Sequence, residues 1–119
     1  MWGFASNGSL IVNVLNSVNN AVSAKYSSSL VQNTWTHVAQ TFSSANGNRL
    51  YINGALVNTA LDSTGRPIGP YIFLGAPPSG SNSCPSGSIT IGQFYGSLDE
   101  FRVFGKALSS VDICRLAYP

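Results

Sequence analysis

The chain has 119 residues with six basic and four acidic side chains, and its formal net charge is +2. A chain of this length is predicted to form one domain, residues 1–119, alone or within a longer precursor. The basic residues are scattered singly, which argues against nucleic-acid binding because that function requires clustered cations. No apolar run approaches the roughly 20 residues that span a bilayer, so we expect no membrane span.

The first predicted elements are short β-strands separated by a turn. Residues 9–16 are predicted as a strand, with one face formed by Leu10, Val12 and Val14 and the other by Ile11, Asn13 and Leu15. Polar residues at 17–20 predict a turn, and residues 21–26 predict a second strand.

The centre of the chain predicts a strand, a loop and then a tight hairpin. Residues 35–42 are rich in β-branched and aromatic types, which favour strands, and a loop of small polar residues follows at 43–48. Asn53-Gly54 is the dipeptide that best tolerates the positive φ angles of a type I′ turn. We therefore expect strands at 49–52 and 55–58 on either side of it.

The last third predicts further strands around an irregular stretch. Residues 71–74 are apolar on both faces, which is typical of a central strand, and residues 88–91 and 98–104 are also predicted as strands. The Pro-, Gly- and Ser-rich stretch at 76–87 is predicted as a long loop. Ser109, followed by an acidic residue three positions later, predicts a capping box and a short C-terminal helix.

Two cysteines and a glycosylation sequon indicate whether the protein is secreted or remains in a reducing compartment. Cys84 lies in the long loop and Cys114 in the predicted helix, without the further Cys or His that a closed zinc site needs. We predict a disulfide between them, worth on the order of 3 to 4 kcal/mol, and the alternative is two free thiols in a reducing compartment. Asn7 begins an Asn-Gly-Ser sequon and is a predicted glycosylation site. Disulfide and sequon favour secretion.

Two separated stretches of the sequence carry a resemblance to a known family. The run WTHVAQTF at 35–42 is followed by LYING at 50–54, and GSLDEFRVF at 96–104 is followed by ALS at 107–109. Together they resemble the signature of laminin G-like domains, which belong to the concanavalin A-like lectin/glucanase superfamily. The resemblance implies a two-sheet antiparallel jelly-roll sandwich that is extracellular and binds glycans or matrix proteins.

The sequence departs from this family at its beginning. Laminin G-like domains are longer, and strands that should precede Ser9 are not predicted here. A sandwich that lacks strands has open sheet edges and an uncovered apolar strip. We expect the gap to be filled by sequence from a longer precursor or by another copy, through β-augmentation.

The acidic residues argue against an enzyme. A glycosidase needs two carboxylates that face one sugar ring at about 5 to 9 Å from each other. Asp99 and Glu100 are neighbours on a predicted strand and should therefore point to opposite faces. The ExDxxE-type spacing of the superfamily's glucanases is also absent.

Several residues of the resembling stretches are predicted to have structural roles. We expect His37 to be a buried neutral side chain, hydrogen-bonded to backbone or to Asp99. Asp99 is expected to point inward and to be satisfied by hydrogen bonds. We assign Trp35 to the fold as well, because it lies within a predicted strand, and Asn53 and Gly54 to the hairpin turn.

The resemblance suggests calcium as a possible cofactor, because many laminin G-like domains bind calcium at a rim of the sandwich. Asp62 is the one candidate carboxylate, with Asn58 and Asn82 as neutral helpers. The alternative for Asp62 is a solvated turn residue that bonds its own backbone.

Candidate glycan contacts are aromatic side chains beside polar loops. Candidates for an aromatic platform are Trp2, Tyr71, Tyr95 and Tyr118. The alternative for each is a side chain that is partly buried in the core. The loops at 62–66 and 79–83 would add polar contacts. The predicted ligand-binding residues are Tyr71, Tyr95, Asn82 and Arg66.

The sequence thus predicts an all-β, two-sheet jelly-roll sandwich with a short C-terminal helix, without catalytic activity. We expect an extracellular binding or adhesion module that contacts a glycan or a matrix protein through rim loops. The alternative is a structural subunit of an extracellular assembly, in which open sheet edges join copies into a homo-oligomer.

Overall fold

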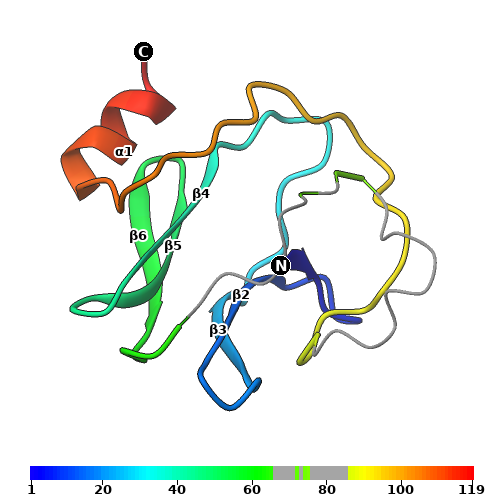
Figure 1. Cartoon of the computed structure of the whole chain (residues 1–119). Coiled ribbons are helices and arrows are strands. Elements are labelled where there is room, and N and C mark those ends of the chain that lie inside the picture. The colour runs from blue at the N-terminus through cyan, green and yellow to red at the C-terminus, as the bar shows by residue number, and fades with distance from the viewer. Residues whose placement is uncertain (66–71, 73, 76–85) are drawn as a thin grey trace.

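The protein is a small antiparallel β-sandwich with one C-terminal helix (Figure 1). This computed structural model describes residues 1–65, 72, 74, 75 and 86–119. Two sheets of three strands each are formed, in the orders β1-β2-β3 and β4-β5-β6. The elements are β1 (Trp2–Phe4), β2 (Leu10–Leu15), β3 (Ala21–Tyr26), β4 (Val38–Ser43), β5 (Gly47–Ile52), β6 (Ala55–Ala60) and α1 (Ser110–Ala117).

The first sheet forms because β2 carries apolar residues on both faces. Leu10 pairs with Tyr26 of β3 and with Phe4 of β1, so β2 is the central strand. The prediction that no strand precedes Ser9 is wrong, because the three residues of β1 pair there. The predicted strands at 9–16 and 21–26 are confirmed.

Two tight turns, each with a glycine in it or directly after it, define the second sheet. Asn53 and Gly54 have φ angles of 48° and 76°, so the predicted type I′ turn joins β5 to β6. Gly47, at φ 69°, follows the turn in which the Asn46 N–H donates to the carbonyl of Ser43 at 3.2 Å. This three-residue connection fixes the register of β4 against β5, in which Val38 lies opposite Ile52.

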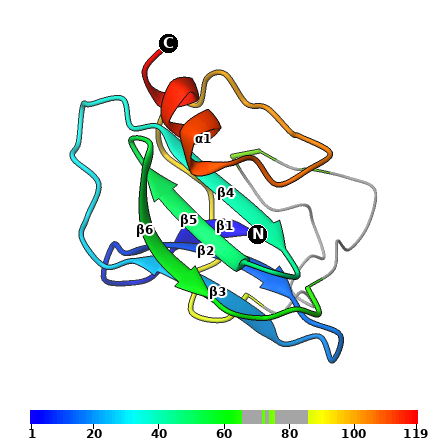
Figure 2. The same ribbon diagram turned by 90° about the vertical axis from the view of Figure 1, so that its left-hand side faces the viewer.

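Figure 2 shows the strands of the two sheets from another side, and the core lies between these sheets. Leu10, Val12 and Ala24 from the first sheet pack against Leu50 and Ile52 from the second, and all five are buried. Burial of a Leu, Ile or Val side chain contributes roughly 1.5 to 3 kcal/mol, so these side chains hold the sheets together.

A buried amide also bridges the sheets. Asn48 of β5 is completely buried, and its Nδ2 donates to the carbonyls of Val12 at 2.8 Å and Val22 at 2.9 Å. Its Oδ1 accepts a hydrogen bond from Gln40 Nε2 at 2.6 Å, and Gln40 Oε1 accepts one from the indole of Trp2. The chain of bonds joins β1, β4 and β5 to the carbonyls of β2 and β3.

Some predicted strands are wrong because the described residues supply no neighbour for them. Residues 88–91 are not a strand, although the Thr90 N–H donates to the Phe4 carbonyl at 2.8 Å and Ile89 packs over Gly3. Residues 98–104 are exposed coil, and the positive φ of Glu100 interrupts an extended run. In the predicted strand at 71–74, residues 72 and 74 are coil and the other two lie outside the described residues.

The helix α1 confirms the predicted capping box. Ser109 Oγ accepts from the Asp112 N–H, and the Asp112 carboxylate accepts from the Ser109 N–H in return. The hydrogen bonds from Ser109 also lower the pKa of Asp112. The helix packs on the hairpin, because a Cβ built on Gly54 would lie 3.0 Å from Cys114 Cα. At eight residues, α1 is too short to cross a membrane, and the described residues contain no other helix.

The predicted disulfide between Cys84 and Cys114 is not formed. Cys114 is an exposed free thiol on α1, and Cys84 lies outside the described residues. The helix does not need this cross-link to stay in place, because Ile113 is buried beneath it and the capping box fixes its start.

Candidate functional site

One pocket lies where the second sheet, the hairpin turn, the 98–104 segment and the end of α1 meet. Its volume is about 520 Å³, and we call it the Trp35 pocket. It is lined by Trp35, Thr36, His37, Asn53, Asp99, Glu100, Ala117 and Tyr118.

Reciprocal hydrogen bonds position the floor of the Trp35 pocket. The His37 N–H donates to Asn53 Oδ1 at 3.0 Å, and the Asn53 N–H donates to the His37 carbonyl at 2.8 Å. Because Asn53 is held in the positive-φ hairpin turn, these bonds fix His37, the residue that precedes β4, against that turn. The residue that shapes the hairpin therefore also shapes the pocket.

His37 presents a neutral imidazole with an unused nitrogen. Burial lowers the pKa of His37 below the ordinary value of 6.5, so the ring is uncharged at neutral pH. Its Nδ1 is buried and lacks a hydrogen-bond partner among the described residues, so the predicted side-chain bond to Asp99 is absent. Because this nitrogen has almost no accessible surface, it does not face the open pocket, and only the rest of the His37 side chain lines it.

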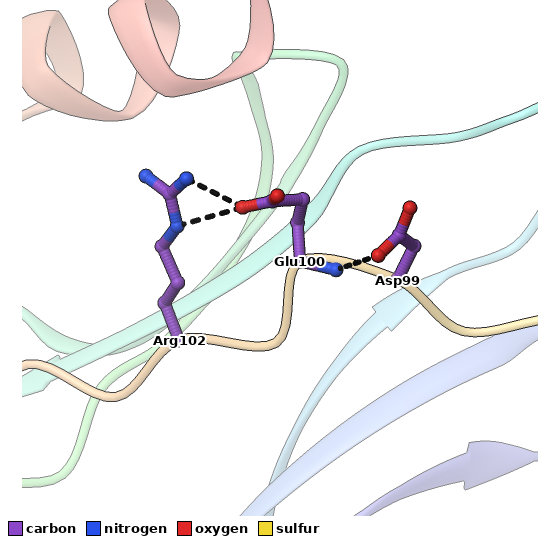
Figure 3. A network of polar contacts seen from close by, with 3 residues as sticks. All are labelled: Asp99, Glu100 and Arg102. Atoms are coloured by element: carbon purple, nitrogen blue, oxygen red, sulfur yellow. Dashed lines mark hydrogen bonds and ion pairs between the residues drawn. The ribbon is translucent and has the colours of Figure 1, made fainter.

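The acidic side of the pocket comes from the 98–104 segment (Figure 3). Asp99 is exposed, and its Oδ1 accepts a hydrogen bond from the Glu100 N–H at 2.8 Å. Glu100 Oε2 is ion-paired with Arg102 Nη2 at 2.5 Å. The prediction of an inward, buried Asp99 is wrong, because no strand forms there to turn it toward the core.

Two aromatic side chains form the apolar part of the pocket. Trp35 is 69% exposed and Tyr118 is 68% exposed, and both line the pocket. Trp35 is not within a strand, so its assignment to the fold is wrong. The sequence does contain a signal that Trp35 lies outside the strand. The Asn53-Gly54 turn ends β5 at Ile52, and Ile52 pairs with Val38. Residues before Val38 therefore have no strand partner on β5.

Comparison with known proteins places the chain in a family. The sequence matches a laminin G family profile, described as the concanavalin A-like lectin/glucanases superfamily, over residues 1–114. The chain belongs to this superfamily. The match confirms the resemblance that the two motifs indicated.

A solved structure shares the fold of this laminin G-like domain. It is an S-layer domain-containing protein, residues 221–444, from Clostridium thermocellum, with a TM-score of 0.54 and 23% sequence identity. The alignment covers 94% of this chain and 64% of that chain, so the domain spans less than two thirds of that structure. No curated protein matches the chain at a significant level.

The other predicted ligand-binding residues of this laminin G-like domain do not meet in the Trp35 pocket. Tyr95 is 88% exposed and lies outside it. Tyr71, Asn82 and Arg66 lie outside the described residues.

The predicted glycosylation site lies in a tight exposed turn. Asn7 is exposed, and its Oδ1 accepts a hydrogen bond from the Ser9 N–H at 3.1 Å. Ser9 itself is buried, with its hydroxyl 3.4 Å from the carbonyl of Ser27. Glycosylation of Asn7 stays a prediction.

The described residues around Asp62 do not make up a calcium site. Asp62 Oδ1 accepts hydrogen bonds from the hydroxyl and the N–H of Thr64, both at 2.6 Å, and these bonds lower the pKa of Asp62. Asn58 is exposed on β6, and Asn82 lies outside the described residues. The part of the chain that the structure describes contains no cluster of three or more His, Cys, Asp or Glu side chains. Calcium needs six to eight oxygen ligands, and Asp62 has the contacts of a turn residue.

Proposed function

We propose that this laminin G-like domain is a non-catalytic extracellular module that binds a glycan in the Trp35 pocket. The observation that carries the proposal is the placement of two exposed aromatic side chains, Trp35 and Tyr118, beside the exposed carboxylate of Asp99. Small-ligand sites combine apolar and aromatic lining with a few positioned polar groups, and this pocket has both.

The chemistry of a sugar ring matches these groups. The C–H face of a pyranose is apolar and packs on an exposed indole, which removes apolar surface of both from water. The ring hydroxyls can donate hydrogen bonds to the exposed Asp99 carboxylate, which accepts them.

The carboxylates of the pocket do not support glycoside hydrolysis. Asp99 and Glu100 both line the pocket, so the expectation that they point to opposite faces does not hold. Glu100, however, is exposed and ion-paired with Arg102, whereas a general acid requires a carboxyl group in an apolar setting. We therefore assign binding rather than catalysis.

An extracellular location is part of the proposal. It is supported by the superfamily, by the neutral and hydroxyl-rich composition, and by the fold shared with an S-layer domain-containing protein. A matrix protein remains the second ligand class, and the glycan is favoured because the pocket is small and carries aromatic side chains.

A glycan array tests the proposal. The wild-type chain is compared with Trp35→Ala and with the control Tyr95→Ala, which removes an even more exposed aromatic side chain outside the pocket. We expect specific glycan signals that Trp35→Ala abolishes and Tyr95→Ala preserves. Signals that depend on Tyr95 instead, or a complete lack of glycan binding by the folded wild-type chain, would contradict the proposal.

A further inference from the structure

The described residues that line the Trp35 pocket include acidic side chains but no lysine or arginine. The carboxylates of Asp99 and Glu100 both belong to this lining. His37 adds no positive charge at neutral pH, because burial lowers its pKa below the ordinary 6.5. A ligand that enters the pocket therefore meets a negative electrostatic potential.

The two carboxylates differ in how far their charge is neutralised. Glu100 Oε2 is ion-paired with Arg102 Nη2 at 2.5 Å and also accepts from Arg102 Nε at 3.1 Å. Asp99 Oδ1 accepts from the Glu100 backbone N–H at 2.8 Å, and Asp99 forms no ion pair with a described residue. Figure 3 shows its second carboxylate oxygen turned away from that hydrogen bond. The uncompensated charge of the pocket is therefore that of Asp99.

The two aromatic side chains of the pocket add to the negative potential. Trp35 is 69% exposed and Tyr118 is 68% exposed, so both side chains are open to a ligand. The face of an aromatic ring is the negative part of its quadrupole, and it attracts cations, most strongly in tryptophan. A ligand that packs on these rings is therefore favoured if it also carries a positive charge.

The C-terminal end of α1 also lies at the pocket. Ala117, the last residue of α1, and Tyr118, its C-cap, are among the lining residues. The last carbonyl groups of a helix carry the negative end of the helix dipole, which favours a nearby cation. Arg115 lies in the last turn of α1, but it is exposed and does not line the pocket.

We propose that the Trp35 pocket selects a glycan that carries a protonated amine, that is, an amino sugar without an acetyl group. This selectivity rests on the proposed glycan binding and names the class of glycan. A hexosamine combines an apolar C–H face with an ammonium group on the same ring. The C–H face would pack on Trp35, and the ammonium group would donate charge-assisted hydrogen bonds to Asp99.

The same groups discriminate against other glycans. A neutral sugar packs on Trp35 equally well, but it forms no ion pair with Asp99. A glycan that carries sulfate or carboxylate groups would place a negative charge beside Asp99, and no described lysine or arginine lines the pocket to compensate it. The pocket thus contains both an attractive element for amino sugars and a repulsive one against acidic sugars.

The expected preference follows from the strength of exposed ionic contacts. An exposed ion pair and an exposed cation–π contact each strengthen binding by up to about fivefold. Together they predict a preference of about tenfold for an amino sugar over its acetylated form, which should decrease as added salt screens the charges. The chain itself has a net charge of +2, so non-specific attraction does not explain such a preference.

Calorimetric titration with matched oligosaccharides tests the preference. The probes are the β-1,4-linked tetramers of glucosamine, N-acetylglucosamine and glucose, of which the last controls for the bulk of the acetyl group. At about pH 6 the amines of the first tetramer are protonated. We expect the glucosamine tetramer to bind about tenfold more tightly than the other two, and its affinity to fall with added salt.

Asp99→Asn tests the residue to which the selectivity is assigned. Asparagine retains an oxygen that accepts from the Glu100 N–H, so the variant removes the charge and keeps the local structure. It should weaken binding of the glucosamine tetramer about threefold to fivefold and leave the acetylated tetramer unaffected. The matched control Asp62→Asn removes a carboxylate outside the pocket and should change neither affinity.

The possible outcomes separate this selectivity from glycan binding itself. Trp35-dependent binding of all three tetramers with equal affinity, or of acidic glycans in preference to them, would overturn the selectivity and leave the proposed function intact. A loss of affinity in Asp62→Asn as large as that in Asp99→Asn would also overturn it. A folded chain that binds no glycan at all would contradict both.

A preference for the glucosamine tetramer that Asp99→Asn removes and Asp62→Asn retains would support the selectivity.

Discussion

Replacing Asn48 by alanine tests whether the buried amide joins the two sheets. Asn48 is completely buried and makes three hydrogen bonds, to the carbonyls of Val12 and Val22 and with the amide of Gln40. Each bond contributes about 0.5 to 1.5 kcal/mol net, and the buried carbonyl of Val12 would lose its bond without gaining water. Asn48→Ala should therefore lower the free energy of unfolding by about 3 kcal/mol.

Urea unfolding followed by circular dichroism measures this loss. In a thermal melt the same change corresponds to a fall in Tm of about 12 °C, at about 4 °C per kcal/mol for a domain of this size. The control is Asn46→Ala, because Asn46 is exposed and its side chain accepts only from Arg49, so its loss should stay below about 0.5 kcal/mol. A loss below about 1 kcal/mol for Asn48→Ala would show that the amide does not bridge the sheets.

Three further predictions concern the hairpin, the helix and pH. Gly54→Ala should destabilise the fold by roughly 2 to 4 kcal/mol, because a Cβ at φ 76° is strained and meets Cys114 of α1, whereas Gly92→Ala meets nothing and should be neutral in the same urea titration. Ser109→Ala should cost about 1 kcal/mol through loss of the N-cap, and an unchanged urea midpoint would contradict this. The pKa of His37 is lower in the folded chain than its ordinary 6.5, so the unfolded chain binds a proton at this residue more readily. The free energy of unfolding should therefore be highest above pH 6.5 and should fall as the pH drops below that value. His37→Gln should flatten that part of the stability profile, and an identical slope in the variant would refute the assignment.

The local signals in the sequence predict the fold better than they predict the site. Asn53-Gly54 forms its turn and Ser109 its capping box because each depends on a few neighbouring residues. The strand at 9–16 forms because its apolar residues pair with a second strand, β3, that begins only a few residues later. These features need no knowledge of distant segments.

The candidate site could not be predicted because it depends on which strands find partners. Residues 98–104 alternate like a strand, but they are coil here, and Asp99 is therefore exposed in a pocket instead of buried. Trp35 is of a residue type that favours strands, but β5 ends at Ile52, opposite Val38, and offers Trp35 no partner. Tyr118 was a candidate by residue type alone, and only the docking of α1 on the hairpin brings it beside Trp35.

The tryptophan signals of the wild-type chain test the central claim most directly. The chain has two tryptophans, Trp35 in the pocket and Trp2 bonded to Gln40, so a nitrogen-15 correlation spectrum shows two indole N–H peaks. On titration with the glycan that gives the strongest array signal, the Trp35 peak should move to saturation while the Trp2 peak stays in place. A titration that moves Trp2 alone, or neither peak, would contradict the account.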